Sequence, residues 1–228
     1  MPEKFRVDIA PDQSVTAMVY RGAAPVSAGI ALILGHGAGA GQTNSFMVSF
    51  AAALAARGID AVTFNFAYTE NGRRLPDPKD KLEACYRAVI DAVRGHGEIG
   101  GNRLAIGGKS MGGRIASQVA AAGVRDLAGL VFLGYPLHPP GKPDQLRAKH
   151  LPDITAPMLF VQGSRDAFGT PDELRPILRT LTAPAELHIV DGADHSFKVL
   201  KSAGVAQADV YKTIQDRIDK WLRDTAKA

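Results

Sequence analysis

Short apolar runs alternate along the chain with longer segments that have helical periodicity. Residues 5–10 and 15–20 flank the turn-rich sequence Pro-Asp-Gln-Ser at positions 11–14, which predicts an opening hairpin. Six further apolar runs predict strands, at residues 30–34, 61–66, 103–108, 130–134, 158–163 and 185–190. Several of them are almost continuously apolar, which is typical of strands that helices cover on both faces.

The segments between these runs carry the pattern of amphipathic helices. Before the run at 103–108, apolar residues recur three and four positions apart and form one stripe, composed of Leu82, Cys85, Tyr86, Val89, Ile90 and Val93. We expect Asp77 to cap this helix, with Pro78 in its first turn, and Gly95 to end it. Thr170 and Glu173 match a capping box that opens another helix, and a final amphipathic stripe includes Val210, Tyr211, Ile214, Ile218, Trp221 and Leu222.

The alternation of strands and helices predicts the fold class. Successive strands joined through helices form a mostly parallel sheet with helices on both faces, which makes three layers. No linker rich in Pro, Gly or Ser divides the chain, and no internal repeat is visible. We therefore expect a single α/β domain over residues 1–228.

Composition narrows the class of protein. The chain has 228 residues, 46% of them hydrophobic, so its core needs no disulfide or structural metal. Its one cysteine, Cys85, lies on the apolar stripe and is predicted to be a core residue. No run approaches the roughly 18 apolar residues that cross a membrane, and the charged first residues lack an apolar leader segment. We therefore expect a cytoplasmic protein with no membrane partner.

The formal net charge of +4 and the isoelectric point near 9.2 raise the question of nucleic-acid binding. Lys and Arg are, however, spread along the chain and interleaved with Asp and Glu. No basic run and no aromatic stacking module is evident. We predict a mildly basic surface and no nucleic-acid partner.

The strongest candidate for chemistry is the sequence Gly108-Lys109-Ser110-Met111-Gly112. An apolar strand leads into Ser110, and a helix of small residues follows it. A serine on so sharp a strand-to-helix turn presents its hydroxyl away from the sheet. Small residues are needed on both sides because the strand and the helix approach closely there.

A serine hydroxyl is a weak nucleophile unless a base removes its proton. Of the six histidines, only His195 lies in a loop directly after the last predicted strand. Asp166 follows the preceding strand, so Ser110, Asp166 and His195 are predicted to meet at the carboxyl edge of the sheet, in the chain order Ser, Asp, His. Asp191 and Asp194 remain rival carboxylates.

Acyl transfer also needs donors for the developing oxyanion. We predict the backbone N–H of Met111 as one donor. The second is predicted to be the N–H of Ala38, in the glycine-rich loop at residues 34–41 that follows a strand. His36 in the same loop is interpreted either as a hydrogen-bonding residue that shapes the loop or as a substrate contact.

Two nucleotide-binding motifs are only partly matched. A phosphate-binding P-loop needs glycine where the chain has Arg103. The loop from Gly35 to Ala40 fits a loose dinucleotide fingerprint, but the next strand does not end in an acidic residue. We therefore predict no cofactor and no metal.

Several of these motifs together resemble the α/β-hydrolase superfamily, from about Leu32 to Trp221. They are Gly35-His36-Gly37, the sequence around Ser110, Asp166 and Asp194-His195, in this order. Within that superfamily the chain resembles small, lidless, dienelactone-hydrolase-like proteins, although dienelactone hydrolases have Cys where this chain has Ser110. Residues 134–142 and 162–169 further resemble hydrolase-like proteins related to the testis-expressed and non-specific-lethal-complex proteins. The resemblance implies an eight-stranded sheet and a Ser–Asp–His triad.

Together these observations predict a serine esterase that acts on small or polar esters or thioesters. About two dozen residues separate the runs at 130–134 and 158–163, which is too few for a helical cap domain. Basic residues near the same sheet edge either are solvated surface or contact an anionic part of the substrate: Lys109, Arg73, Arg74, Arg114 and Arg165. The alternative function is a catalytically silent binding or scaffold module with the same fold. The sequence does not indicate an oligomeric state.

Overall fold

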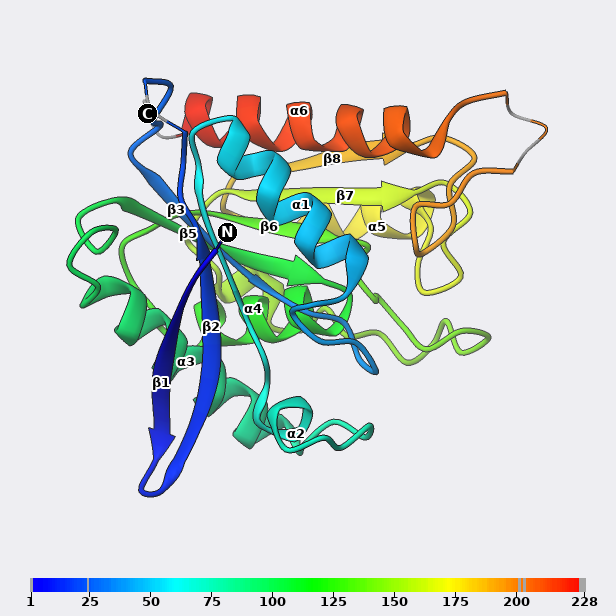
Figure 1. The fold of residues 1–228 in the computed structure, drawn as a ribbon. Helices are drawn as coiled ribbons and strands as arrows, with labels where there is room; N and C mark the ends of the chain where they lie inside the picture. The colour runs from blue at the N-terminus through cyan, green and yellow to red at the C-terminus, as the bar shows by residue number, and fades with distance from the viewer. Residues whose placement is uncertain (1, 24, 201, 203, 226–228) are drawn as a thin grey trace.

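The computed structural model describes residues 2–23, 25–200, 202 and 204–225. Within them eight strands form one sheet in the order β1-β2-β4-β3-β5-β6-β7-β8 (Figure 1). The pairs β1–β2 and β2–β4 are antiparallel, and all other neighbouring strands are parallel. The predicted hairpin and the six further strands are confirmed, with these bounds: β1 (Glu3–Ala10), β2 (Gln13–Tyr20), β3 (Ile30–Gly35), β4 (Asp60–Phe64), β5 (Arg103–Lys109), β6 (Leu127–Leu133), β7 (Met158–Gly163) and β8 (Ala185–Val190).

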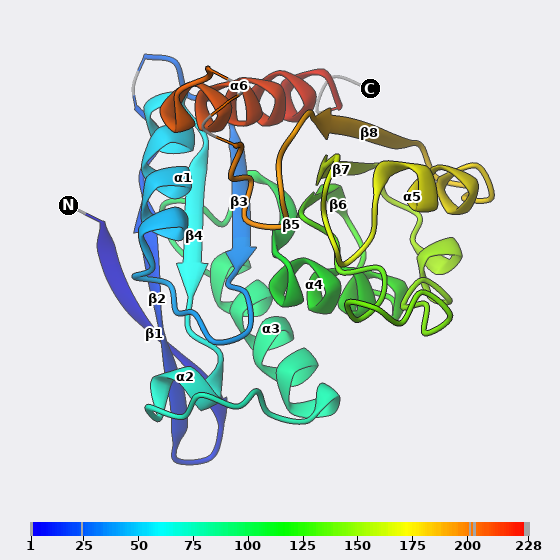
Figure 2. The ribbon, with the colours of Figure 1, turned by 90° about the vertical axis from the view of Figure 1, so that its right-hand side faces the viewer.

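Helices cover both faces of the sheet, as predicted. Helices α1 (Ser45–Ala56) and α6 (Gln207–Thr225) pack on one face, and α3 (Lys79–Arg94) and α4 (Met111–Ala121) pack on the other (Figures 1 and 2). Two short helices, α2 (Ala67–Glu70) and α5 (Pro171–Leu178), follow β4 and β7. Each face has its own hydrophobic cluster, because successive side chains of a strand point to opposite sides.

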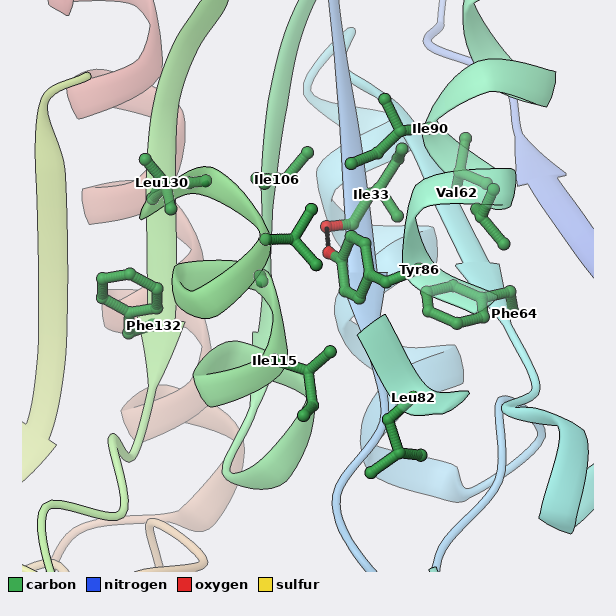
Figure 3. Packing of buried hydrophobic residues seen from close by; sticks show 14 of the residues in the cluster. Ile33, Val62, Phe64, Leu82, Tyr86, Ile90, Ile106, Ile115, Leu130 and Phe132 are labelled. Carbon is green, nitrogen blue, oxygen red and sulfur yellow. Dashed lines mark hydrogen bonds between the residues drawn. The ribbon is translucent and has the colours of Figure 1, made fainter. Parts of the chain in front are cut away.

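The stripe of α3 contributes an entire face to one cluster (Figure 3). Its Tyr86 is fully buried, and the phenol donates to the carbonyl oxygen of Gly107 at 2.7 Å while accepting from the Gly107 N–H at 3.1 Å. The same hydroxyl lies 3.2 Å from the carbonyl oxygen of Ile33. Burial raises the pKa of Tyr86, so the phenol stays neutral. Tyr86 thereby connects α3 to β3 and β5, the two strands that lead into the predicted site.

One predicted helix cap is wrong. Helix α3 begins after Pro78, with no side-chain cap, and the carboxylate of Asp77 instead accepts a hydrogen bond from Arg73 at 2.7 Å. The predicted end at Gly95 is confirmed. The capping box of α5 is confirmed too, because the Thr170 side chain accepts from the Glu173 N–H and the Glu173 side chain accepts from the Thr170 N–H.

The connection between β6 and β7 contains one short 3-10 helix, η1 (Leu151–Asp153), and otherwise loops. No large cap domain therefore covers the carboxyl edge of the sheet, in agreement with the predicted fold. None of the helices in the described part of the chain is both long and apolar enough to cross a membrane.

Candidate active site

Ser110 occupies a strained turn between β5 and α4. Its φ of 51° and ψ of −114° place a non-glycine residue in a sparsely populated region, at a cost of about 1–3 kcal/mol. Two backbone hydrogen bonds hold it there: its N–H donates to the carbonyl oxygen of Leu133 in β6, and its carbonyl oxygen accepts from the Arg114 N–H, both at 3.0 Å. The sheet and the first turn of α4 together therefore fix the serine.

Glycines make this turn possible because three backbones meet at it. A β-carbon on Gly112 would lie 2.1 Å from the carbonyl oxygen of Gly35, and one on Gly108 would lie 2.3 Å from the same oxygen. Gly108 also has a φ of 151°, which side chains disfavour. The spacing of glycines around Ser110 thus reflects the close approach of β3, β5 and α4.

The structure brings Ser110, His195 and Asp166 into one chain of hydrogen bonds. Nε2 of His195 lies 2.8 Å from Oγ of Ser110, and Nδ1 lies 2.7 Å from Oδ2 of Asp166. An ionised carboxylate only accepts, so Nδ1 carries the proton in the neutral ring and Nε2 is free to accept from the serine. The two rival carboxylates do not contact the ring: Asp191 accepts from Ser164, and Asp194 accepts from backbone amides of its own loop.

Asp166 is buried and held by a residue that the sequence analysis missed, Gln162. The Gln162 amide nitrogen donates to Oδ2 of Asp166 at 2.9 Å and to the carbonyl oxygen of Gly169 at 2.7 Å, while its oxygen accepts from the Tyr135 N–H at 2.8 Å. Oδ1 of Asp166 accepts from the Phe168 N–H at 2.8 Å. The only signal in the sequence was a polar residue within an otherwise apolar strand.

Two further side chains support His195. The ring of Phe168 lies 4.2 Å from the imidazole, centroid to centroid, at an angle of 30°. Nζ of Lys109 donates to the carbonyl oxygen of His195 at 2.7 Å, and it lies 5.5 Å from the ring centroid of Phe197. Burial lowers the pKa of Lys109 to about 8, although Asp166 and Asp194 act in the opposite direction. Lys109 therefore supports the His195 loop, and its role as a substrate contact stays a prediction.

The loop after β3 lies beside Ser110. A β-carbon on Gly37 would be 3.7 Å from Cβ of the serine, which is an ordinary contact. Neither the Ala38 N–H nor the Met111 N–H donates a hydrogen bond to another atom of the described chain. Both amides are thus available as donors, and their oxyanion role remains a prediction.

His36 does not line the cavity into which Ser110 opens, which corrects its prediction as a substrate contact. Its side chain is fully buried, with Nδ1 2.8 Å from the carbonyl oxygen of Gly37 and Nε2 accepting from the Phe66 N–H at 3.2 Å. Burial lowers the pKa of His36, which keeps the ring neutral. The structure therefore favours the alternative interpretation, a residue that shapes the loop.

Ser110 and His195 open into a cavity of about 730 Å³. Its wall includes Ala38, Met111, Lys109 and Arg114. Other predicted basic residues lie elsewhere: Arg74 is exposed and outside the cavity lining, Arg73 pairs with Asp77, and Arg165 donates to the carbonyl oxygen of Gly192. Arg147, which the sequence analysis did not consider, lines the cavity as well.

Comparison with family models identifies the chain. Residues 28–223 match the model of an alpha/beta hydrolase domain. The chain belongs to the alpha/beta hydrolase family. The glycine-rich loop after β3 is therefore part of a hydrolase fold.

Solved structures similar to this hydrolase fold cover nearly its full length. A serine hydrolase without a lid from Xanthomonas campestris has a TM-score of 0.75 at 22% identity, covering 96% of this chain and 94% of its own. A dienelactone hydrolase from Anabaena variabilis has a TM-score of 0.73 at 18% identity, covering 96% of each chain. An esterase domain from Rhodothermus marinus has a TM-score of 0.71 at 14% identity, covering 98% of each chain. At these identities the likeness concerns the fold; the narrower resemblance to the testis-expressed and non-specific-lethal-complex proteins stays a prediction.

Proposed function

We propose that this alpha/beta hydrolase is a serine esterase that cleaves small or polar carboxylic esters or thioesters through an acyl-enzyme on Ser110. The observation that carries the proposal is the unbroken chain of hydrogen bonds from Ser110 through His195 to Asp166, which opens into the cavity. A serine, an imidazole and a carboxylate in this geometry form the arrangement that activates a hydroxyl nucleophile.

In the first half of the reaction, Oγ of Ser110 attacks the ester carbonyl while Nε2 of His195 accepts its proton. Asp166 stabilises the imidazolium that forms. The N–H groups of Ala38 and Met111 donate to the oxyanion, and Met111 adds the positive end of the α4 dipole. His195 then gives the proton to the leaving alcohol or thiol as the carbon–oxygen or carbon–sulfur bond breaks.

In the second half, water hydrolyses the acyl-enzyme. His195 removes a proton from the water, whose oxygen attacks the acyl carbonyl, and the same amides hold the second oxyanion. Collapse of this intermediate returns the proton to Oγ of Ser110 and releases the carboxylic acid. Each protein group thus ends in its starting state, and no cofactor is consumed.

The comparisons and the fold support this proposal. Similar structures include a serine hydrolase without a lid, a dienelactone hydrolase and an esterase domain. The connection between β6 and β7 has no large cap to enclose a long acyl chain, which favours small or polar substrates.

Labelling with a fluorophosphonate and turnover of aryl acetates test the proposal. Ser110→Ala is expected to lose the label and to lower kcat by about 10⁴-fold or more, since residues of such a triad act as a unit. Ser45→Ala is a matched control, because Ser45 lines the same cavity without contacting His195; it should keep both activities. Persistent labelling of Ser110→Ala would reassign the nucleophile, and a wild-type protein that neither labels nor turns over esters would favour the silent binding module.

A further inference from the structure

Two arginines in the cavity wall have no hydrogen-bond or ion-pair partner for their guanidinium groups in the described part of the chain. Arg114 lies on α4 one turn after Ser110, and Arg147 lies in the connection between β6 and β7; both line the cavity. Within the described residues, neither guanidinium makes an ion pair or a hydrogen bond, and Nε of Arg114 is buried without an acceptor. Leaving a buried donor unpaired costs about 1–3 kcal/mol.

Several arginines elsewhere in the described chain do have an acidic partner. Arg57 is paired with Asp216, Arg217 with Glu186 and Arg223 with Asp219. Burial lowers the pKa of Arg114, and the positive charge of Arg147 lowers it further. The two cations therefore repel each other, although the charge of Glu83 acts in the opposite direction.

Two acidic residues on this side of the cavity, Asp77 and Glu83, each lie beside another cation. Asp77, in the cavity wall, lies 2.7 Å from Arg73. Glu83 attracts Arg114 electrostatically, and its buried Oε1 makes no hydrogen bond in the described chain but lies 3.3 Å from Nζ of Lys79, which is itself in the cavity wall. This side of the cavity thus carries excess positive charge.

Neighbouring polar groups do not neutralise that charge. Burial raises the pKa of Tyr135 to about 12, so its phenol stays uncharged beside the arginines. Burial, together with the charges of Lys79 and Arg114, lowers the pKa of His150 to about 4.

The backbone of Arg147 is anchored on both sides, because its N–H donates to the carbonyl oxygen of Leu137 and its carbonyl oxygen accepts from the Tyr135 hydroxyl, both at 2.8 Å.

We propose that Arg114 and Arg147 form an anion subsite that binds a carboxylate carried by the substrate, away from the ester that Ser110 attacks. Guanidinium groups match a carboxylate because each offers paired N–H donors in one plane. The substrate class is an ester whose acyl or alcohol half bears a free carboxylate. The inference rests on the proposed esterase function for the cleavage step, whereas the binding step stands on the two arginines.

Matched pairs of esters test the subsite. Monoethyl adipate and its neutral terminal amide place the group on the acyl half, and 4-acetoxybenzoate and 4-acetoxybenzamide place it on the alcohol half. In at least one pair the carboxylate is expected to have a kcat/KM about tenfold or more above that of the amide, as expected for charge-assisted hydrogen bonds. Arg114→Gln and Arg147→Gln should each bring this ratio toward one, and taking the ratio cancels any general effect on Ser110.

Arg74→Gln is the control variant, because Arg74 is exposed and outside the cavity lining; it should keep the ratio.

A binding measurement separates the two proposals: adipate should raise the Tm of Ser110→Ala, and an additional Arg114→Gln change should remove that rise. If turnover depends on Ser110 but the ratio is one for both pairs, the subsite is refuted while the esterase stands. A larger Tm rise with inorganic phosphate than with adipate would also overturn the carboxylate assignment. Arginine-dependent binding of adipate without turnover of any ester would support the subsite and refute the esterase.

Discussion

The two sides of the cavity differ in how their polar groups are satisfied. On the side formed by the loops after β7 and β8, Asp166, His195 and Gln162 all have hydrogen-bond partners at 2.7–2.9 Å. On the side formed by α4 and the β6–β7 connection, the guanidinium groups of Arg114 and Arg147 have none in the described chain.

The difference indicates two separate tasks. A fully satisfied buried network holds its members in one geometry, which a reaction between fixed atoms requires. Two neighbouring cations lower the stability of the folded protein, and binding of an anion between them would offset this cost; such a loss of stability is common at functional sites. We therefore expect the first side to be sensitive to isosteric substitutions and the second side to tolerate them.

The largest expected effect comes from Asp166→Asn on the satisfied side. The substitution keeps the shape of the side chain but favours the wrong tautomer of His195, so kcat should fall by about 10³–10⁴-fold. Steady-state turnover of an aryl acetate measures this loss. Asp191→Asn is the control, since Asp191 contacts Ser164 and not the imidazole. A comparable loss of kcat in Asp191→Asn would show that the carboxylate role had been assigned to the wrong residue.

Gln162→Leu removes the side chain that holds Asp166 on the same side of the cavity. It leaves the Tyr135 N–H without an acceptor and removes a donor to Asp166, so the free energy of unfolding should fall by about 1–3 kcal/mol. Urea denaturation measures the change. Gln118→Leu is a matched control, because among the described residues the buried side-chain oxygen of Gln118 has no hydrogen-bond partner. Equal destabilisation by both variants would contradict the importance of the network.

Arg147→Gln should show the opposite sign on the unsatisfied side. Removing one of two repelling cations is expected to leave stability unchanged or to raise it by about 0.5 kcal/mol. Arg57→Gln is the comparison, since it removes one of the two cations paired with Asp216 and should not stabilise the protein. Thermal unfolding without ligand compares the Tm of the two variants with that of the wild type. Clear destabilisation by Arg147→Gln would mean that the Arg147 guanidinium has a stabilising partner.

A further prediction concerns the pH dependence of stability. The pKa of His150 is lowered to about 4 from its usual value of 6.5, so between these values the folded protein binds fewer protons than the unfolded chain. The contribution of His150 therefore lowers stability as the pH falls from 6.5 toward 4. His150→Gln should flatten this part of the profile, and Lys79→Gln should flatten it less, because it removes only one of the charges that act on His150. Identical profiles for wild type and His150→Gln, from urea denaturation at pH 7 and pH 5, would contradict the assignment.

Local sequence patterns determined the strands, the amphipathic helices and the turn that carries Ser110. Alternation, helical periodicity and glycine spacing act over a few neighbouring positions, and the parallel connections then place the carboxyl ends of the strands at one edge. These rules were enough to predict that Ser110, Asp166 and His195 come together. They misplaced the cap of α3, because the preference of Asp77 for Arg73 depends on how the preceding loop folds back.

Only the tertiary structure decided between Asp166, Asp191 and Asp194, and only the structure showed that His36 is buried while Arg147 faces the cavity. The physical reason is that burial and pairing are properties of a whole environment. Gln162, Tyr135 and Asp166 form their network from different loops and strands, and no local pattern records which of several polar residues will find partners when the loops converge.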